Sequence, residues 1–91
     1  MKGQKRVERL KPRLRELYAV HKQLEKLGAP PSIREVTNAL GLDENCVSRV
    51  HGDLEALEKL GLVERLPIPT RRFRCIGPPP DEINWEELLD P

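Results

Sequence analysis

Aromatic side chains are scarce in this 91-residue chain, where Phe, Trp and Tyr occur once each and together make up 3%. So few rings all but exclude the aromatic stacking platform that binds single-stranded nucleic acids. The sequence has no apolar run long enough to span a bilayer and no N-terminal signal segment, so we expect a cytoplasmic protein with no membrane partner. Hydrophobic residues make up 37% of the chain, which suffices for one small domain with a core of Leu, Val, Ile and Ala.

Residues that carry enzyme chemistry are equally sparse. Cys46 and Cys75 stand at no metal-like spacing, and we expect two reduced thiols without a metal. His21 falls within an apolar helical stripe and is expected to be a partly buried structural histidine, because the sequence places no acid or cysteine to assist it. No paired carboxylates, nucleophile–base set or phosphate-cradling loop is visible. The sequence therefore predicts a protein that is not an enzyme and that holds neither a cofactor nor a metal.

Charge is unevenly distributed, although the net charge is +1. Residues 1–22 carry eight Lys or Arg against two acids, residues 23–80 carry eight of each sign, and residues 81–91 carry five acids and no base. The basic start includes Lys5, Arg6 and Arg9, which could neutralise phosphates and make an affinity salt-dependent. A solvated basic tail is the alternative interpretation.

Three helices are predicted by apolar spacing and by capping residues. The first runs from about Pro12 to Leu27, since Leu side chains recur at steps of three and four and Gly28 with two prolines ends the pattern. The second is short, opens at Ser32 with a capping box and ends at Gly41. The third begins after the N-cap residue Asp43 and continues to about residue 60.

Two strands and a short terminal helix complete the predicted elements. Residues 62–66 and 71–76 alternate like strands around a proline-containing hairpin loop. Asn84 opens the terminal helix with Glu87 as its capping-box partner. The predicted fold class is mainly α with a small β-hairpin, in the order of a winged helix-turn-helix with three helices plus a wing. We divide the chain into a basic N-terminal arm (1–11), this domain (12–77) and a Pro-rich spacer with an acidic amphipathic tail (78–91).

The third helix presents a face of short or polar side chains opposite its apolar stripe. In a winged helix-turn-helix this helix enters the major groove of DNA, where Arg pairs with guanine and Asn with adenine. The candidate base-reading residues are Glu44, Asn45, Ser48, Arg49 and Gly52. Gly52 costs about 1 kcal/mol relative to Ala inside a helix, which indicates tight packing, close approach of another backbone or room for a ligand. Contacts to the DNA backbone are expected from Ser32, Arg34 and the wing residues Arg71, Arg72 and Arg74.

Three motifs follow one another between Leu24 and Cys75. They are GAPPSIREV at 28–36, ALGL at 39–42 and VHGDLEALEKLGLV at 50–63. In this order they resemble the DNA-binding domain of LexA-type repressors, and the resemblance implies a winged helix-turn-helix that binds DNA. Residues 43–49 are slightly longer than the family pattern, and Thr37 stands where Ala is usual. The chain ends at Pro91 without the self-cleaving, dimerising domain, so no protease switch is implied.

The leading hypothesis is sequence-specific binding of double-stranded DNA by a small bacterial or phage transcription regulator, most simply a repressor. It could act as a homodimer on a palindromic site. The alternative is a winged-helix factor that binds a transcription or replication protein, with the acidic tail around Trp85 as the contact. Trp85, Leu88 and Leu89 form the small apolar face of this tail. That face docks on its own domain, swaps onto a second copy in a dimer, or recruits a protein partner.

Overall fold

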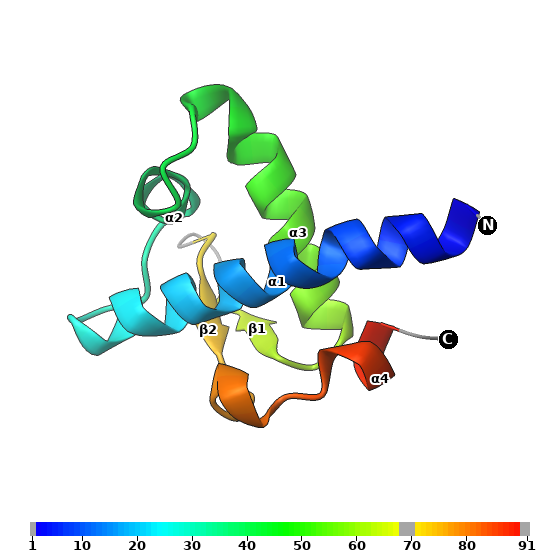
Figure 1. Cartoon of the computed structure of the whole chain (residues 1–91). Helices are drawn as coiled ribbons and strands as arrows, with labels where there is room; N and C mark the ends of the chain where they lie inside the picture. Colours follow the sequence, from blue (N-terminus) through cyan, green and yellow to red (C-terminus); the bar gives the residue numbers. More distant parts are fainter. Residues whose placement is uncertain (1, 68–70, 90–91) are drawn as a thin grey trace.

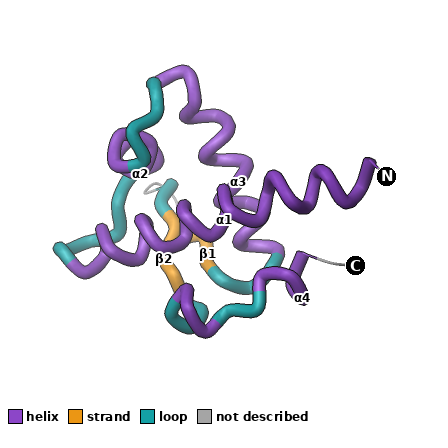
Figure 2. Tube along the Cα trace, in the orientation of Figure 1, coloured by secondary structure: helices purple, strands orange, loops and turns teal. Residues whose placement is uncertain are grey.

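The computed structural model of the chain describes the backbone of residues 2–67 and 71–89, and the side chains of residues 11–67 and 71–89. The elements, in chain order, are α1 (Lys2–Lys26), α2 (Ile33–Ala39), the 3-10 helix η1 (Glu44–Cys46), α3 (Val47–Lys59), β1 (Val63–Arg65), β2 (Phe73–Cys75), the 3-10 helix η2 (Pro80–Glu82) and α4 (Trp85–Leu89). Helices dominate the chain and one hairpin accompanies them, which confirms the predicted fold class (Figure 2).

The first helix starts earlier than the sequence predicted. It begins at Lys2 and runs through Pro12, so the expected start near Pro12 was wrong. Residues 2–11 consist largely of Lys, Arg, Gln and Glu, which are good helix formers, and their contribution outweighs the hydrogen bond that an interior proline removes. The N-terminal turns of α1 extend beyond α3 (Figure 1). Lys5, Arg6 and Arg9 lie on these turns, and their side chains fall outside the described part of the chain.

A buried stripe of α1 forms the centre of the core. Leu14, Leu17, Tyr18 and His21 are at most 1% exposed and occupy one face of the helix. The elements α2, α3, β2, η2 and α4 all contact α1, and in Figure 1 they are arranged on both sides of it. The rest of the core comprises Val36, Val50, Leu54, Leu57, Leu62, Val63, Phe73 and Trp85. Aliphatic side chains thus supply most of the core, as expected from the composition.

The hairpin is short and antiparallel. Val63 pairs with Cys75, Glu64 with Arg74 and Arg65 with Phe73. Each strand has three residues, fewer than the sequence predicted. The backbone N–H of Leu66 donates to the carbonyl of Arg72 at 2.9 Å, so pairing continues one step beyond the strands. The predicted loop residues Pro69 and Thr70 lie outside the described residues.

The C-terminal segment docks on its own domain. Trp85 is 4% exposed, and its ring meets that of Tyr18 edge to face, with centroids 5.9 Å apart and planes inclined at 71°. Asn84 caps α4 as predicted, because its Oδ1 accepts the backbone N–H of Glu87 at 3.2 Å. Leu89 packs against the core, whereas Leu88 is 38% exposed. Of the three alternatives for the tail, the structure shows Trp85 docked in cis. A contact of Trp85, Leu88 and Leu89 with a partner or a second copy stays a prediction.

Tyr18 gives the fold a spectroscopic test, since the chain has one tyrosine. Its hydroxyl donates to the carbonyl of Pro78 at 2.8 Å, and burial raises its pKa from 10 to about 12. Because the phenolate is disfavoured in the folded state, the associated stabilisation is present below pH 10 and is lost between pH 10 and 12. We expect the ultraviolet phenolate titration to have its midpoint near the higher value. A midpoint near 10 in a chain that remains folded by circular dichroism would show that Tyr18 is not buried.

Candidate nucleic-acid interface

The N-terminus of α2 is fixed by the predicted capping box. The Ser32 hydroxyl accepts the backbone N–H of Glu35 at 3.1 Å, and the Glu35 carboxylate accepts the backbone N–H of Ser32 at 3.3 Å. These hydrogen bonds from Ser32 hold the pKa of the exposed Glu35 carboxyl below its usual value. The short helix is thus ordered at its first turn, where helices of this length are otherwise marginal. Arg34 lies exposed within that turn.

A glycine turn connects α2 to the next helical segment. Gly41 has φ +73°, a left-handed conformation in which a side chain would be strained. The N–H of Leu42 reaches back to the carbonyl of Thr37 at 3.1 Å. Thr37 is fully buried, and its hydroxyl donates to the carbonyl of Ile33 at 2.8 Å. A threonine therefore fits where Ala is usual, because its hydroxyl is satisfied within its own helix.

The face predicted to read bases is exposed as a unit. Asp43 caps the 3-10 turn η1, accepting the N–H of Asn45 at 3.1 Å, and α3 continues directly from it. The five predicted residues are all exposed, two on η1 and three on α3: Glu44, Asn45, Ser48, Arg49 and Gly52. A Cβ built on Gly52 would meet no described atom within 4 Å. Tight packing inside the chain therefore does not explain Gly52, and the helix is open to close approach from outside.

An ion pair that sequence reasoning missed holds this helix on α1. Asp53 follows Gly52 but points inward and is 7% exposed. The Arg13 Nη2 donates to Asp53 Oδ1 at 2.9 Å, and Arg13 Nε lies 2.9 Å from Asp53 Oδ2. The pair has one hydrogen bond, because Nε is close to the carboxylate but makes no hydrogen bond of its own. This charge-assisted contact fixes the position of α3 relative to α1. Arg13 is thus engaged within the fold.

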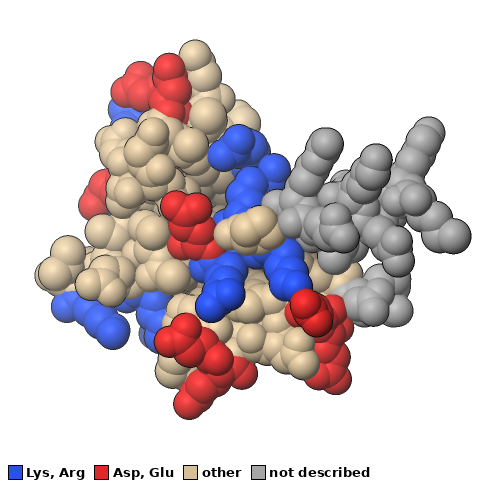
Figure 3. All heavy atoms as spheres, in the orientation of Figure 1, with Lys and Arg blue, Asp and Glu red and all other residues tan. Residues whose placement is uncertain are grey.

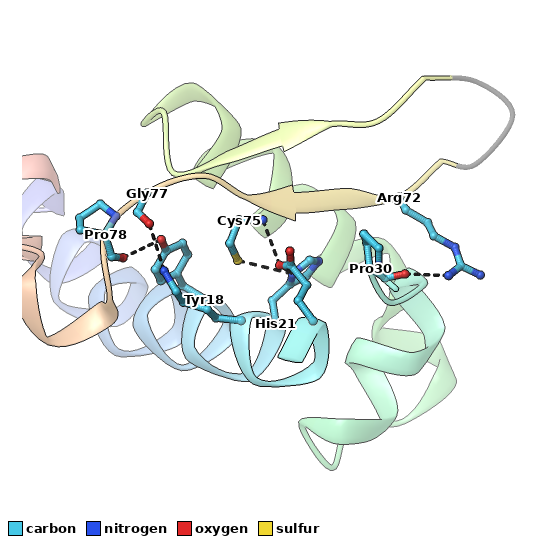
Figure 4. Close-up of polar contacts among 9 residues, drawn as sticks. Tyr18, His21, Pro30, Arg72, Cys75, Gly77 and Pro78 are labelled. Atoms are coloured by element: carbon cyan, nitrogen blue, oxygen red, sulfur yellow. Dashed lines mark hydrogen bonds and ion pairs between the residues drawn. The ribbon is translucent and has the colours of Figure 1, made fainter. Parts of the chain in front are cut away.

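The three wing arginines take three different positions. Arg71 is exposed at φ +50°. Arg72 is half-buried at the loop end of the hairpin, and its Nη1 donates to the carbonyl of Pro30, just before α2, at 2.7 Å (Figure 4). Arg74 pairs with Glu64 on the neighbouring strand. Arg65 on β1 contacts Glu55 and Glu58 of α3, each at 3.2 Å. Arginines thus attach the hairpin to α3 and to the segment before α2. Of the three arginines predicted on the wing, Arg71 is the one whose side chain makes no hydrogen bond or ion pair with a described residue.

The basic middle of α1 faces the acidic C-terminal segment. Lys11 Nζ lies 2.6 Å from Glu86 Oε1, and Arg15 Nη2 lies 3.9 Å from Asp81 Oδ1. The Lys11 ammonium lowers the pKa of the Glu86 carboxyl, both by hydrogen bonding and by its charge. Figure 3 shows Lys and Arg gathered centrally on this face, with acidic groups near them. Exposed pairs of this kind add little stability, but they partly neutralise the basic face.

The arginines of the candidate interface differ from the others in having no polar partner within the described part of the chain. Among the arginines whose side chains the structure describes, five have a polar partner in the chain: Arg13, Arg15, Arg65, Arg72 and Arg74. The three without a hydrogen bond or ion pair in that part of the chain are Arg34 on α2, Arg49 on α3 and Arg71 on the wing. Asn45 and Ser48 likewise make no side-chain hydrogen bond to a described residue. The free polar groups thus lie on the elements that form a DNA-binding surface in winged domains.

His21 corrects the expectation drawn from the sequence. It is fully buried, and both an acid and a cysteine contact it. Its Nδ1 lies 2.8 Å from Glu25 Oε2, one helical turn away, and 3.6 Å from the Cys75 Sγ on β2 (Figure 4). Burial and the Glu25 carboxylate raise the pKa of the Cys75 thiol well above its ordinary value. The spacing of His21 and Glu25 was the one signal for this cluster that the sequence contained.

A capped short helix, a glycine turn, an exposed polar helix face and an adjoining hairpin define a winged helix-turn-helix domain. Residues 7–72 match the family described as LexA DNA binding domain, and the chain belongs to this family. It is similar to the LexA repressors of Staphylococcus epidermidis (37% identical) and Staphylococcus aureus (38% identical) over 88% of its length, which is 38% and 39% of those proteins. It is 42% identical to the LexA repressor of Acetivibrio thermocellus over 64% of its length and 26% of that protein.

The chain spans less than two-fifths of the length of these repressors. No solved structure matches it at a significant level. None of its described helices is long and apolar enough to cross a membrane.

The Arg13–Asp53 pair predicts an unequal response to two matched substitutions. Asp53→Asn removes the charge of a nearly buried carboxylate, and we expect urea unfolding to show a loss of about 1–2 kcal/mol. Glu64→Gln removes the exposed partner of Arg74, and the expected change is below about 0.5 kcal/mol. Equal losses in the two variants would contradict a special anchoring role for Asp53.

Proposed function

We propose that the chain binds double-stranded DNA in a sequence-specific manner, as the DNA-binding part of a repressor-like transcription regulator. The observation that carries the proposal is the position of the unpaired arginines on α2, α3 and the wing. Membership of the LexA DNA-binding domain family supports the same function.

In this proposal, η1 and the first half of α3 enter the major groove. Because Ser48 has a short side chain and Gly52 has none, the exposed face of the helix carries little bulk at these positions. The helix axis can therefore approach the base edges closely. Arg49 has the reach and the donors to bind guanine O6 and N7, and Asn45 can pair with adenine N6 and N7. The Asp43 cap and the Arg13–Asp53 pair hold these side chains in register with the rest of the domain.

Contacts to the DNA phosphates then come from α2, which precedes α3, and from the wing, which follows it. Arg34 and the hydroxyl of Ser32 lie at the start of α2, where helix N-termini favour phosphate. The Ser32 oxygen accepts the Glu35 N–H, so its own proton remains available to a phosphate oxygen. Arg71 extends from the wing, while Arg72 attaches the loop end of the hairpin to the segment before α2. Such contacts position the protein without selecting bases.

Repression is proposed from the relatives, which are named as repressors. A domain of this size that occupies a promoter prevents access of other proteins by bulk alone. Two copies on a palindromic site would double the contact area that one module offers. The rival function, recruitment of a transcription or replication protein through the acidic tail, loses its main anchor because Trp85 is buried against Tyr18. We propose binding rather than catalysis as the activity of this chain.

Selection of duplexes from a random pool tests sequence specificity directly. We expect one preferred sequence to emerge, and Arg49→Ala to cost about 1–3 kcal/mol on it while relaxing preference at one base pair. Arg15→Ala removes the same charge from α1 and serves as the matched control, with at most a minor effect expected. The function is refuted if no sequence is selected and the two variants bind alike.

Arg71 is predicted to act through phosphate. Arg71→Ala should weaken binding to preferred and random duplexes by similar factors, because phosphate contacts carry no base information. The slope of log affinity against log salt concentration should fall by about 1, as one released counterion is lost. A change in the selected sequence with an unaltered salt slope would instead place Arg71 against base edges.

A further inference from the structure

A second site lies at the junction of α1 and the wing root, outside the proposed DNA surface. His21 and Glu25 stand one turn apart on α1. The Cys75 side chain of β2 points toward His21 (Figure 4). Their ligand-type atoms all lie within 4.8 Å of one another. The backbone N–H of Cys75 also donates to Glu25 Oε2 at 2.9 Å. Three side chains of the kinds that bind transition metals thus converge from two elements far apart in the sequence.

The charge of Glu25 has no matching cation from Lys or Arg. Its side chain is 17% exposed, and within the described residues its one ion-pair contact is with His21, which is charged only when protonated. A carboxylate this far removed from water is costly unless a positive charge or several hydrogen bonds compensate it. The Cys75 N–H and the His21 Nδ1 both contact this carboxylate, and a metal ion held between the three side chains would compensate its charge further.

The distances match a metal that prefers mixed sulfur, nitrogen and oxygen ligands. Zn–N near 2.0 Å and Zn–S near 2.3 Å at a tetrahedral angle separate the two ligand atoms by about 3.5 Å. The Nδ1–Sγ distance is 3.6 Å. The Nδ1–Oε2 distance of 2.8 Å is a hydrogen-bond length, and a small rotation of the carboxylate would open it to the roughly 3.3 Å that a shared ion requires.

We propose that His21, Glu25 and Cys75 bind a thiophilic divalent cation of the Zn²⁺ class, which joins β2 to α1. The ion forms bonds to Nδ1, a Glu25 oxygen and Sγ, the thiol proton leaves to solvent, and the imidazole hydrogen occupies Nε2. His21 is fully buried, whereas Glu25 and Cys75 are partly exposed, so an ion would enter from their side and a water would complete its ligands there.

The consequence is a cross-link between residues 54 positions apart in the sequence. It is placed beneath the hairpin that carries Arg72 and Arg74, so it would hold the root of the wing. His21, Glu25 and Cys75 lie between α1 and β2 and not on the exposed face of α3. The proposal therefore does not rest on DNA binding.

Titration of the intact, reduced chain with Co²⁺ tests the site, because a cobalt–thiolate bond gives a charge-transfer band in the near ultraviolet. We expect the band to saturate at one equivalent, to disappear on addition of Zn²⁺, and to persist in Cys46→Ser. It should be lost in Cys75→Ser, with circular dichroism as the check on folding. Absence of a band in the unaltered chain, or an equal band in Cys75→Ser, would overturn the proposal and leave a protonated or hydrogen-bonded His21 as the account of the cluster.

Thiol alkylation of the unaltered chain gives a second readout that does not depend on a variant folding. With Zn²⁺ added, the reaction of Cys75 with iodoacetamide should slow while that of Cys46 stays the same, as measured by peptide mapping. Equal rates for Cys75 with and without Zn²⁺ would refute the site.

Discussion

Packing against the buried face of α1 organises this domain. Leu14, Leu17 and Tyr18 are almost completely removed from water and touch helices and hairpin alike. The neighbouring elements are too short to persist alone, since α2 has seven residues and each strand has three. They are ordered because α2 and β2 pack directly on α1, while β1 pairs with β2 and packs on α3. Tyr18 also connects the C-terminal segment, through Trp85 and the Pro78 carbonyl.

Polar contacts add orientation to this hydrophobic packing. Arg13 orients α3 through Asp53, Arg65 attaches β1 to α3, and Arg72 attaches the loop end of the hairpin to the segment before α2. Hydrogen bonds and ion pairs have the directionality that burial lacks, so a few of them fix how the elements face one another. The described arginines therefore form two groups. Those that orient elements are paired within the chain, whereas Arg34, Arg49 and Arg71 have no such partner among the described residues and can bind an external anion or base.

Local features could be predicted from the sequence, and long-range ones could not. The Ser32–Glu35 capping box, the Gly41 turn and the Asn84 cap depend on residues within four positions, and the structure confirms them. The start of α1 was missed because Pro12 is tolerated inside the helix. The exposed face from Glu44 to Gly52 followed from helical periodicity. The partners of Arg13 and Arg72, some forty residues away, had no sequence signal.

The His21 cluster shows the same division. Two of its three members were visible in the sequence as His21 and Glu25 at helical spacing, but the third is supplied by β2. Strand register decides which side chain of the hairpin faces α1, and a register cannot be read from three-residue strands. Whether an isolated cysteine meets a histidine therefore depends on the tertiary packing of the whole domain.

Chemical-shift mapping of the amide groups on binding a selected DNA duplex tests whether residues 44–52 form the DNA-binding surface. If DNA binds as proposed, the largest shifts will fall at residues 44–52, with further shifts at the start of α2 and at Arg71, and little change at α4. Shifts centred on α4 and the basic middle of α1, with residues 44–52 unaffected, would contradict it.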